Sequence, residues 1–202
     1  SDYEALKYFT EFWPSDNTDP IERLFIQWGF SQVFPAKTMC AHVTTWNKNS
    51  SVKFRTDVAM MCKLGFDIKL ADMSKDDETY CRTAVQNYNR LKPVVLEGDM
   101  YRLISPYGSN HTSTMYVGKD KDKAVVFAFD IHPRYAEKTL PVRLQGLDAD
   151  KMYRVKEINL MPGANSSLSG NGEVFSGEFL MNVGLNLFTT QQLNSRVVEV
   201  VA

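Results

Sequence analysis

The hydrophobic pattern changes halfway along the chain, and this change limits the folds that the chain can adopt. Residues 5–92 combine short apolar runs with helical periods, whereas the rest consists mostly of alternating runs between turn sequences. Helical spacing predicts amphipathic helices, and strict alternation predicts half-buried strands. We therefore predict an α/β region at residues 1–93 and an all-β region at residues 94–202, with the boundary at about residues 91–98.

The α/β region has the order strand, loop, helix, repeated. Residues 6–13 are short and aromatic-rich, which predicts a buried strand. A helix is predicted to begin after Asp19, a good N-cap residue, because Pro20 suits the first helical position. We expect Ser74 to cap a later helix and Pro93 to stop it. The elements predicted downstream are a buried strand at 39–43 and helices at 54–64 and 74–91.

This order of elements is typical of a parallel sheet, in which strands alternate with helices. A parallel sheet is normally covered on both faces, and a sheet of so few strands cannot be covered by this region alone. We therefore expect less than half of a closed barrel, with missing partners that complete it. The chain also lacks an initiator methionine, which is typical of a piece of a longer protein.

The all-β region contains about seven short runs with strand character. Turn sequences such as Gly-Asp and Lys-Asp-Lys-Asp separate them. Short strands at this spacing, with turn signals between them, predict an antiparallel β-sandwich. The predicted strands lie near 100–104, 112–117, 124–131, 141–145, 153–158, 172–180 and 197–201.

Charge and cysteine usage exclude several classes of function. Lysine and arginine total 23 against 24 aspartates and glutamates, so the basic surface typical of nucleic-acid binding is missing. No run approaches the ~18 apolar residues of a membrane-spanning helix, and no basic amphipathic run suits a membrane surface. The three cysteines form no Cys-x-x-Cys pair, and histidines and carboxylates do not cluster at metal-ligand spacing. We predict no nucleic-acid or membrane partner, no metal and no cofactor.

The most informative candidate for chemistry is the turn at residues 12–19, between the first predicted strand and helix. It contains two carboxylates and two hydroxyls, and catalytic groups of parallel α/β folds collect at the carboxyl ends of strands. Since Asp19 is used as the helix cap, Asp16 is the acid that has no structural role. The alternative interpretation is that Asp16 is an ordinary turn residue.

A long motif in this turn resembles a known family. The run Trp13-Pro-Ser-Asp-Asn-Thr-Asp-Pro-Ile-Glu-Arg-Leu-Phe-Ile-Gln27 is similar to the Trp-x-Ser-Asp-(Asp/Asn)-Thr-Asp stretch and its continuation in glycoside hydrolase family 36 α-galactosidases. The resemblance implies the end of a (β/α)8 catalytic barrel followed by a C-terminal β-sandwich. The likeness continues over Thr38-Met-Cys-Ala-His-Val43 and over residues 54–60, 65–68, 98–103 and 126–129.

The resemblance also implies roles for individual residues. Asp16 is expected to be the general acid/base of a retaining enzyme that hydrolyses terminal α-linked galactose from oligosaccharides. Such an enzyme uses two carboxyl groups about 5 Å apart, one as nucleophile and one as acid and base. The family's nucleophile lies upstream of Ser1, so we predict that this chain alone is inactive and needs the missing N-terminal part of the same protein. Trp13 either lines the sugar site or is a buried strand residue.

Other functions and roles stay open at this point. One alternative is a related enzyme with the same catalytic residues that hydrolyses α-linked N-acetylgalactosamine or transfers galactosyl groups. Another alternative is a non-catalytic carbohydrate-binding β-sandwich. Family members commonly assemble as tetramers, so a homo-oligomer is a further possibility. We expect His42 to be a structural histidine, Arg55 and Asp57 to form a helix-face ion pair rather than an active-site wall, and His111 and His132 to lie at the surface.

Overall fold

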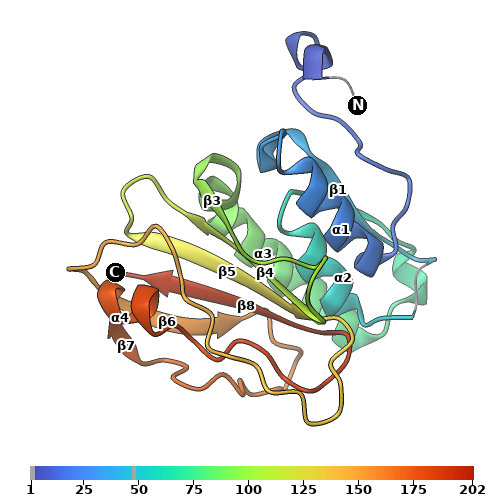
Figure 1. Ribbon diagram of the computed structural model, residues 1–202. Helices are drawn as coiled ribbons and strands as arrows, with labels where there is room; N and C mark the ends of the chain where they lie inside the picture. The colour runs from blue at the N-terminus through green and yellow to red at the C-terminus, as the bar shows by residue number, and fades with distance from the viewer. Residues whose placement is uncertain (1–2, 47–48) are drawn as a thin grey trace.

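A computed structural model describes residues 3–46 and 49–202 (Figure 1). The order of the two regions is as predicted, with mixed helices and parallel strands first and antiparallel strands afterwards. The helices are α1 (Pro20–Phe30), α2 (Val52–Ala59), α3 (Lys75–Glu97) and α4 (Gly177–Asn182), with 3-10 turns η1 (Tyr3–Lys7), η2 (Ala36–Thr38) and η3 (Leu70–Asp72). The strands are β1 (Cys40–Thr44), β2 (Lys63–Asp67), β3 (Asp99–Ile104), β4 (His111–Val117), β5 (Lys123–Asp130), β6 (Met152–Ile158), β7 (Val174–Ser176) and β8 (Asn194–Val201).

The first region is built on a small parallel sheet. Strands β1 and β2 pair in parallel from Cys40 opposite Lys63 to Thr44 opposite Asp67. Phe12 forms a further parallel bridge, to the residue that precedes β1. The three segments therefore run in the same direction, and their carboxyl ends lie at one edge of the sheet. The residues that follow Phe12, β1 and β2 are brought together there.

The predicted strand at residues 6–13 is wrong. The structure has the turn η1 at its start, and only Phe12 pairs with a neighbour. The aromatic side chains of Tyr8 and Phe9 are 82% and 63% exposed, so they do not form a buried strand face. Aromatic composition predicts a strand only where the side chains find a surface to pack on, and here they do not.

Two predicted helix ends are also wrong. Helix α2 ends at Ala59, and Lys63 and Leu64, predicted as the end of this helix, begin the strand β2. Helix α3 runs through Pro93 to Glu97, so the predicted division between residues 93 and 94 falls inside this helix. Proline removes one backbone donor, but the next residues, Val94 and Val95, are buried in the same apolar core as the sheet. That burial keeps the last turn helical.

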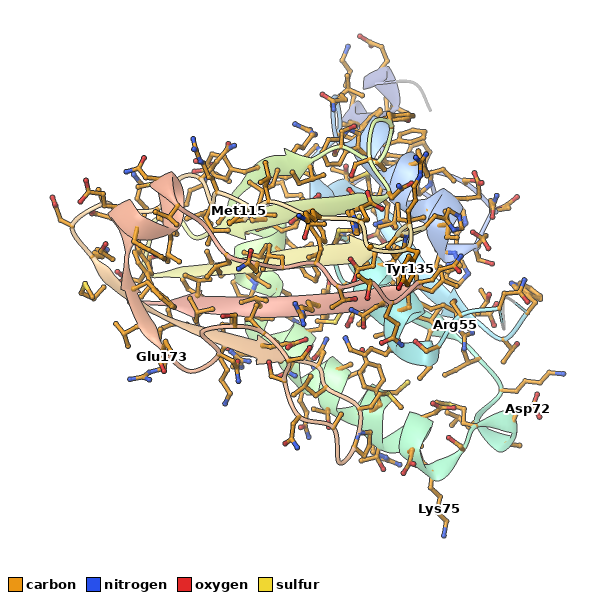
Figure 2. All side chains as sticks on the ribbon, turned by 60° about the horizontal axis from the view of Figure 1, so that its bottom comes forward. Arg55, Asp72, Lys75, Met115, Tyr135 and Glu173 are labelled. Atoms are coloured by element: carbon orange, nitrogen blue, oxygen red, sulfur yellow. The ribbon has the colours of Figure 1, made fainter. Side chains whose placement is uncertain are left out.

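The second region is a six-stranded antiparallel sheet in the order β3-β4-β5-β8-β6-β7. Its side chains alternate between two cores, so that Tyr116 packs with residues of α2 and α3 while its neighbour Met115 packs on the opposite side. Helix α3 crosses one face, and α4 with irregular chain segments covers the other (Figure 1). Figure 2 separates the two regions: Met115 and Glu173 lie among the strands, and Arg55 and Asp72 lie on the helical side.

The second layer of this sandwich is less regular than predicted. The segment 141–145 forms only one bridge, between Val142 and Leu185, and the segment 172–180 is divided between β7 and α4. In the segment 141–145 the alternate apolar side chains of Val142 and Leu144 are buried, whereas in the segment 172–180 only Gly177 and Leu180 are buried. The alternation therefore predicted the burial of the first segment but not the strand pairing of either.

Candidate active site

The turn after Phe12 is held by a series of hydrogen bonds from backbone N–H groups to side chains. The N–H of Asn17 donates to Oγ of Ser15 at 3.1 Å, and the N–H of Asp19 donates to Oδ1 of Asn17 at 2.9 Å. Asp19 in turn accepts from the N–H of Ile21 at 3.0 Å and so caps α1, as predicted. Every second side chain of the turn therefore has a structural role.

Asp16 is left out of this series. Its side chain is exposed, and its carboxyl group forms no hydrogen bond or ion pair with the residues that the structure describes. It follows Phe12 at the edge where the parallel strands end. An ordinary turn aspartate caps backbone donors, and Ser15, Asn17 and Asp19 do so here instead. Asp16 is free to interact with something outside the described chain.

A buried arginine, which sequence reasoning missed, fixes the position of this turn. The guanidinium of Arg23 on α1 donates to the carbonyl oxygens of Ser15 at 3.2 Å and Cys40 at 3.1 Å. Only 4% of Arg23 is exposed, and this burial lowers the pKa of its guanidinium. Its side chain lies on the inner face of α1 with Leu24 and Gln27. The signal in the sequence that could have revealed Arg23 is a charged residue on the face of the helix that packs inward.

A second set of contacts ties the turn to the loop that follows β1. Oγ1 of Thr18 lies 3.1 Å from Oγ1 of Thr44, the last residue of β1. The indole N–H of Trp46 donates to the same Thr18 oxygen at 3.1 Å. The Trp46 side chain itself is 71% exposed. In the loop between β1 and α2, Asn47 and Lys48 lie outside the described residues.

Trp13 and His42 form an aromatic pair beside the turn. Their ring centroids are 3.9 Å apart with an interplanar angle of 52°. Trp13 is 42% exposed in the described chain. Burial lowers the pKa of His42, and the negative charge of Asp67 opposes this effect in part. His42 covers part of the Trp13 ring and is positioned to support it.

Arg55 and Asp57 do not pair with each other. Arg55 donates to the carbonyl oxygen of Thr44, whereas Asp57 forms its helix-face ion pair with Lys53. The Asp57 side chain is completely buried and accepts from Tyr80, Asn159 and Ser195 at 2.8, 3.1 and 2.7 Å. These partners come from α3, the end of β6 and β8. Asp57 is therefore a joint between the two regions and not a wall of the site.

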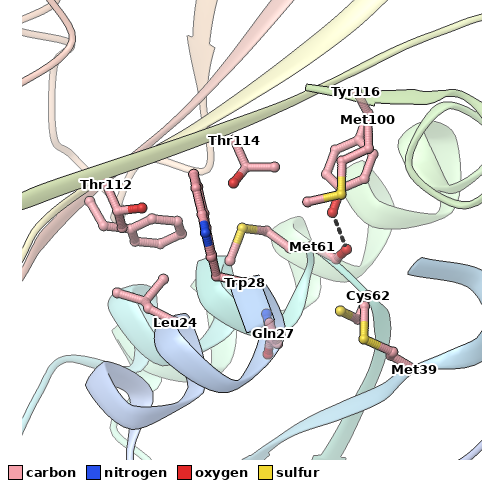
Figure 3. A pocket seen from close by; sticks show the side chains of 11 residues that line it. Leu24, Gln27, Trp28, Met39, Met61, Cys62, Met100, Thr112, Thr114 and Tyr116 are labelled. Atoms are coloured by element: carbon pink, nitrogen blue, oxygen red, sulfur yellow. Dashed lines mark hydrogen bonds between the residues drawn. The ribbon is translucent and has the colours of Figure 1, made fainter. Parts of the chain in front are cut away.

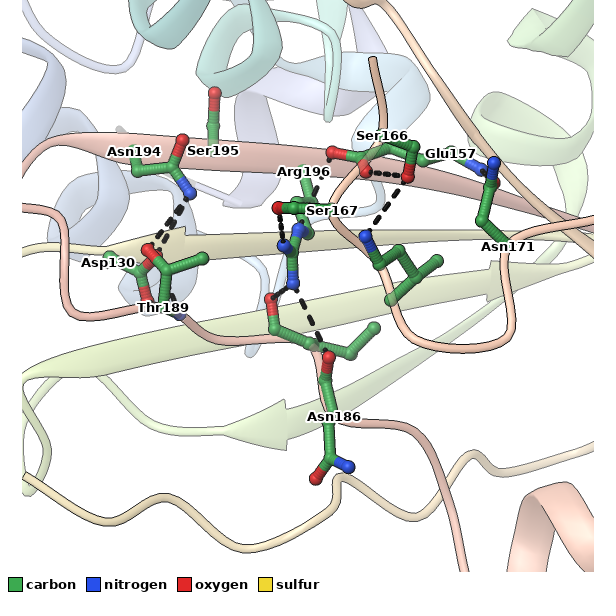
Figure 4. A network of polar contacts seen from close by, with 12 residues as sticks. Asp130, Glu157, Ser166, Ser167, Asn171, Asn186, Thr189, Asn194, Ser195 and Arg196 are labelled. Carbon is green, nitrogen blue, oxygen red and sulfur yellow. Dashed lines mark hydrogen bonds and ion pairs between the residues drawn. The ribbon is translucent and has the colours of Figure 1, made fainter.

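The two histidines of the second region have different surroundings. His132 is exposed, as expected, but His111 is only 3% exposed, so its predicted surface position is wrong. Nδ1 of His111 lies 2.8 Å from Asp130, which also accepts from Thr189 and Asn194. Figure 4 shows Asp130 with Thr189 and Asn194, and beside them a second buried network around Arg196. Turn residues next to a histidine in the sequence do not indicate whether that histidine is buried in the folded chain.

The cavity between α1 and the sheet is too small to be a binding site. It has a volume of about 10 Å³ and is lined by Trp28, Tyr116 and other largely apolar side chains (Figure 3). A single water molecule needs at least about that volume. The hydroxyl of Tyr116 donates to the carbonyl oxygen of Met61 at 2.7 Å across one end of the cavity. The cavity is a packing gap, so the strand-end edge stays the candidate site.

Within the part of the chain that the structure describes, two further kinds of feature are absent. No group of three or more histidine, cysteine, aspartate or glutamate side chains is placed to hold a metal ion. None of the described helices has the length and apolarity required to cross a membrane.

Two family models match the chain one after the other. Residues 1–98 match the Melibiase family, and residues 111–200 match the glycosyl hydrolase family 36 C-terminal domain. Alpha-galactosidase 2 of Hypocrea jecorina is 35% identical over 200 residues, which cover 96% of this chain and 25% of that protein. Probable alpha-galactosidase G of Aspergillus terreus is 34% identical over 199 residues, 96% of this chain and 26% of that protein.

Solved structures with the same fold cover almost the whole chain. The family 36 α-galactosidase AgaB from Geobacillus stearothermophilus superposes with a TM-score of 0.85 at 28% identity, covering 98% of this chain and 26% of that one. A variant of AgaA from the same organism, in complex with raffinose, superposes equally well at 27% identity with the same coverage. The predicted fold class is confirmed, and the chain spans about a quarter of the length of the relatives that it matches.

Proposed function

The chain belongs to glycoside hydrolase family 36, and we propose that it is the C-terminal part of a retaining α-galactosidase that releases terminal α-linked galactose from oligosaccharides. The names of its relatives support this activity, and the raffinose complex of one structural neighbour supports an oligosaccharide substrate. We propose that residues 1–93 are the end of the catalytic barrel and residues 94–202 the C-terminal sandwich. The remainder of the barrel is the missing N-terminal part of the same protein.

Asp16 is proposed as the general acid/base. The observation that carries this role is the turn itself, in which the neighbouring side chains hold the backbone while the Asp16 carboxyl is exposed at the strand ends. Asp16 would donate its proton to the glycosidic oxygen as the bond to galactose breaks. It would then take a proton from the water that releases galactose from the nucleophile.

The nucleophile is proposed to lie in the missing part of the protein. A retaining enzyme needs a second carboxyl group about 5 Å from the acid, and no contact within the described chain places one beside Asp16. We therefore propose that the 202-residue chain alone hydrolyses no α-galactoside. Trp13, whose ring pairs with His42 and which is 42% exposed, is proposed to line the galactose site with its exposed part.

The test is Asp16→Ala in the full-length protein, assayed on two classes of substrate. On raffinose, whose leaving group needs a proton, kcat/KM should fall by about 10²–10⁴-fold. On an aryl α-galactoside with an acidic phenol, the first step needs little protonation, and added azide should restore turnover because azide needs no general base. An equal loss on both substrates, with no effect of azide, would contradict the proposed role.

Asp19→Ala is the matched control, because it removes a carboxylate from the same turn but leaves Asp16 in place. Loss of the helix cap should cost about 1 kcal/mol of stability. Any loss of activity should be similar on the two substrates. A selective loss on raffinose in this variant would show that the turn conformation, rather than the Asp16 proton, determines the difference.

A further inference from the structure

We propose that Trp46 is the platform on which the leaving sugar stacks, that is, the ring attached to the galactose of an oligosaccharide substrate. The proposal rests on the proposed function and assigns one residue of the binding site for the leaving group. It is carried by the exposure of Trp46, by the way its indole is held, and by its place beside the Asp16 turn.

The side chain of Trp46 is highly exposed, yet a hydrogen bond holds its indole ring in one orientation. Tryptophan is usually well buried, yet this side chain is 71% exposed. Its one polar atom, Nε1, donates to Oγ1 of Thr18 at 3.1 Å. A hydrogen bond at the ring edge fixes the orientation of the indole without covering its faces. A fixed, uncovered aromatic face is suited to stacking on the apolar face of a sugar ring.

The position of Trp46 follows from the parallel sheet. Trp46 comes two residues after Thr44, where β1 ends, and Thr18 comes two residues after Asp16. The Thr18 hydroxyl lies within hydrogen-bond distance of both Thr44 and Trp46. Thr18 therefore connects the turn that carries the proposed acid to the loop that carries the tryptophan. The indole and the carboxyl group lie at the same edge of the sheet.

The leaving sugar is favoured over galactose as the ligand of this ring. A general acid acts on the oxygen between galactose and its leaving group, so the groups around Asp16 divide between the two sugars. A small sugar held for catalysis is largely enclosed, and Trp13, partly covered by His42, suits that side. Trp46 is more exposed and lies on a loop, which suits a sugar that extends into solvent.

The experiment uses the full-length protein and compares raffinose with methyl α-galactoside, which has no leaving sugar. For Trp46→Ala, the ratio of kcat/KM on raffinose to kcat/KM on methyl α-galactoside should fall about tenfold, the equivalent of about 1.4 kcal/mol. The change should lie mostly in KM. Trp46→Phe, which keeps an aromatic face, should recover most of the ratio. Inhibition by free sucrose, the leaving group of raffinose, should weaken in parallel in Trp46→Ala.

Tyr8→Ala is the control, because Tyr8 is also exposed but precedes Phe12 and so lies toward the opposite end of the parallel segments. Its substrate ratio should equal that of the unchanged protein. If Trp46→Ala lowers both activities equally, or changes neither, Trp46 packs on another part of the protein or has no ligand, and the inference is wrong. If the unchanged protein hydrolyses neither substrate, the proposed function fails, and the inference fails with it.

Discussion

The two sheets of this molecule differ in how completely they are covered. Every residue of β4, in the antiparallel sheet, is buried, whereas no residue of β2, in the parallel sheet, is fully buried: four are partly buried and one is exposed. Parallel sheets are normally the more enclosed kind. The openness of β2 therefore marks the place where the rest of a barrel is proposed to pack. The proposed chemistry lies at this open sheet, and the antiparallel sheet supplies a covered surface behind it.

The two regions nevertheless share one core. Side chains of α2 and α3 pack together with the inner face of the antiparallel sheet, and Phe54 meets Phe129 edge to face at 5.6 Å between ring centroids. Asp57 adds a buried polar joint between the same elements. A shared core of this kind should make the regions unfold together, although β4 and β5 are more completely covered than β2.

The largest effect is expected for Asp57→Ala. The change leaves the Lys53 ammonium without its carboxylate and removes the acceptor of Tyr80, Asn159 and Ser195. Removing one partner of a buried ion pair costs about 3–5 kcal/mol. The urea midpoint of the chain should fall accordingly, with circular dichroism and tryptophan fluorescence changing together.

Ser195→Ala is the control for this joint, since it removes one of the donors and leaves the charge pair intact. It should cost about 1 kcal/mol. Two separate transitions in the Asp57→Ala variant, or in the unchanged chain, would contradict the view that the regions share one cooperative core.

A smaller effect is expected in the antiparallel region for Arg196→Met. Arg196 is 4% exposed, and its Nε lies 3.5 Å from Oε1 of Glu157, which is also buried (Figure 4). Methionine leaves that carboxylate with the Ser166 hydroxyl as a remaining partner, so we expect a loss of about 3 kcal/mol by urea unfolding. The double change Arg196→Met with Glu157→Leu should recover most of it. A double variant as unstable as the single one would show that the carbonyl contacts of Arg196 matter more than the ion pair.

Arg23→Met is the matching change in the parallel region and should cost less. Arg23 is also 4% exposed, but its partners are two carbonyl oxygens and a glutamine rather than a carboxylate. Unpaired neutral acceptors cost about 1–3 kcal/mol. In the full-length protein the same variant should lose activity, because the Ser15 carbonyl that it releases adjoins Asp16. A loss of stability equal to that of Arg196→Met would remove the difference between the two regions.

The helix starts were predicted correctly because they depend on residues that are close together in the sequence. Asp19 and Ser74 start helices as expected because a cap acts on backbone donors two or three residues away. The end of α3 was missed because the burial of Val94 and Val95 against a sheet outweighs the missing donor of Pro93. The strands that bury these residues follow later in the sequence. Residues that signal a helix end, such as proline, give no information about those strands.

The same limit applies to the site. Asp16 was selected by elimination within one short turn, and the motif around it carried the family resemblance. Arg23 and Trp46 were missed as site residues because their partners, Cys40 and Thr18, lie 17 and 28 residues away. Pairings at that distance depend on the parallel register of the strands, which the sequence pattern does not specify.

The smallest effect is a pH dependence confined to the open region. Burial against Trp13 holds the pKa of His42 below the value of about 6.5 in an unfolded chain. As the pH falls below 6.5, the unfolded chain binds a proton that the folded chain does not, so stability is lost until the pH reaches the folded pKa. His42→Gln should reduce this loss by a few tenths of a kcal/mol at most, since solvent screens a ring that is only partly buried. The measurement is urea unfolding at pH 7.5 and 5.5, with exposed His132→Gln as the control. A larger change for His132→Gln than for His42→Gln would place the acid sensitivity in the sandwich.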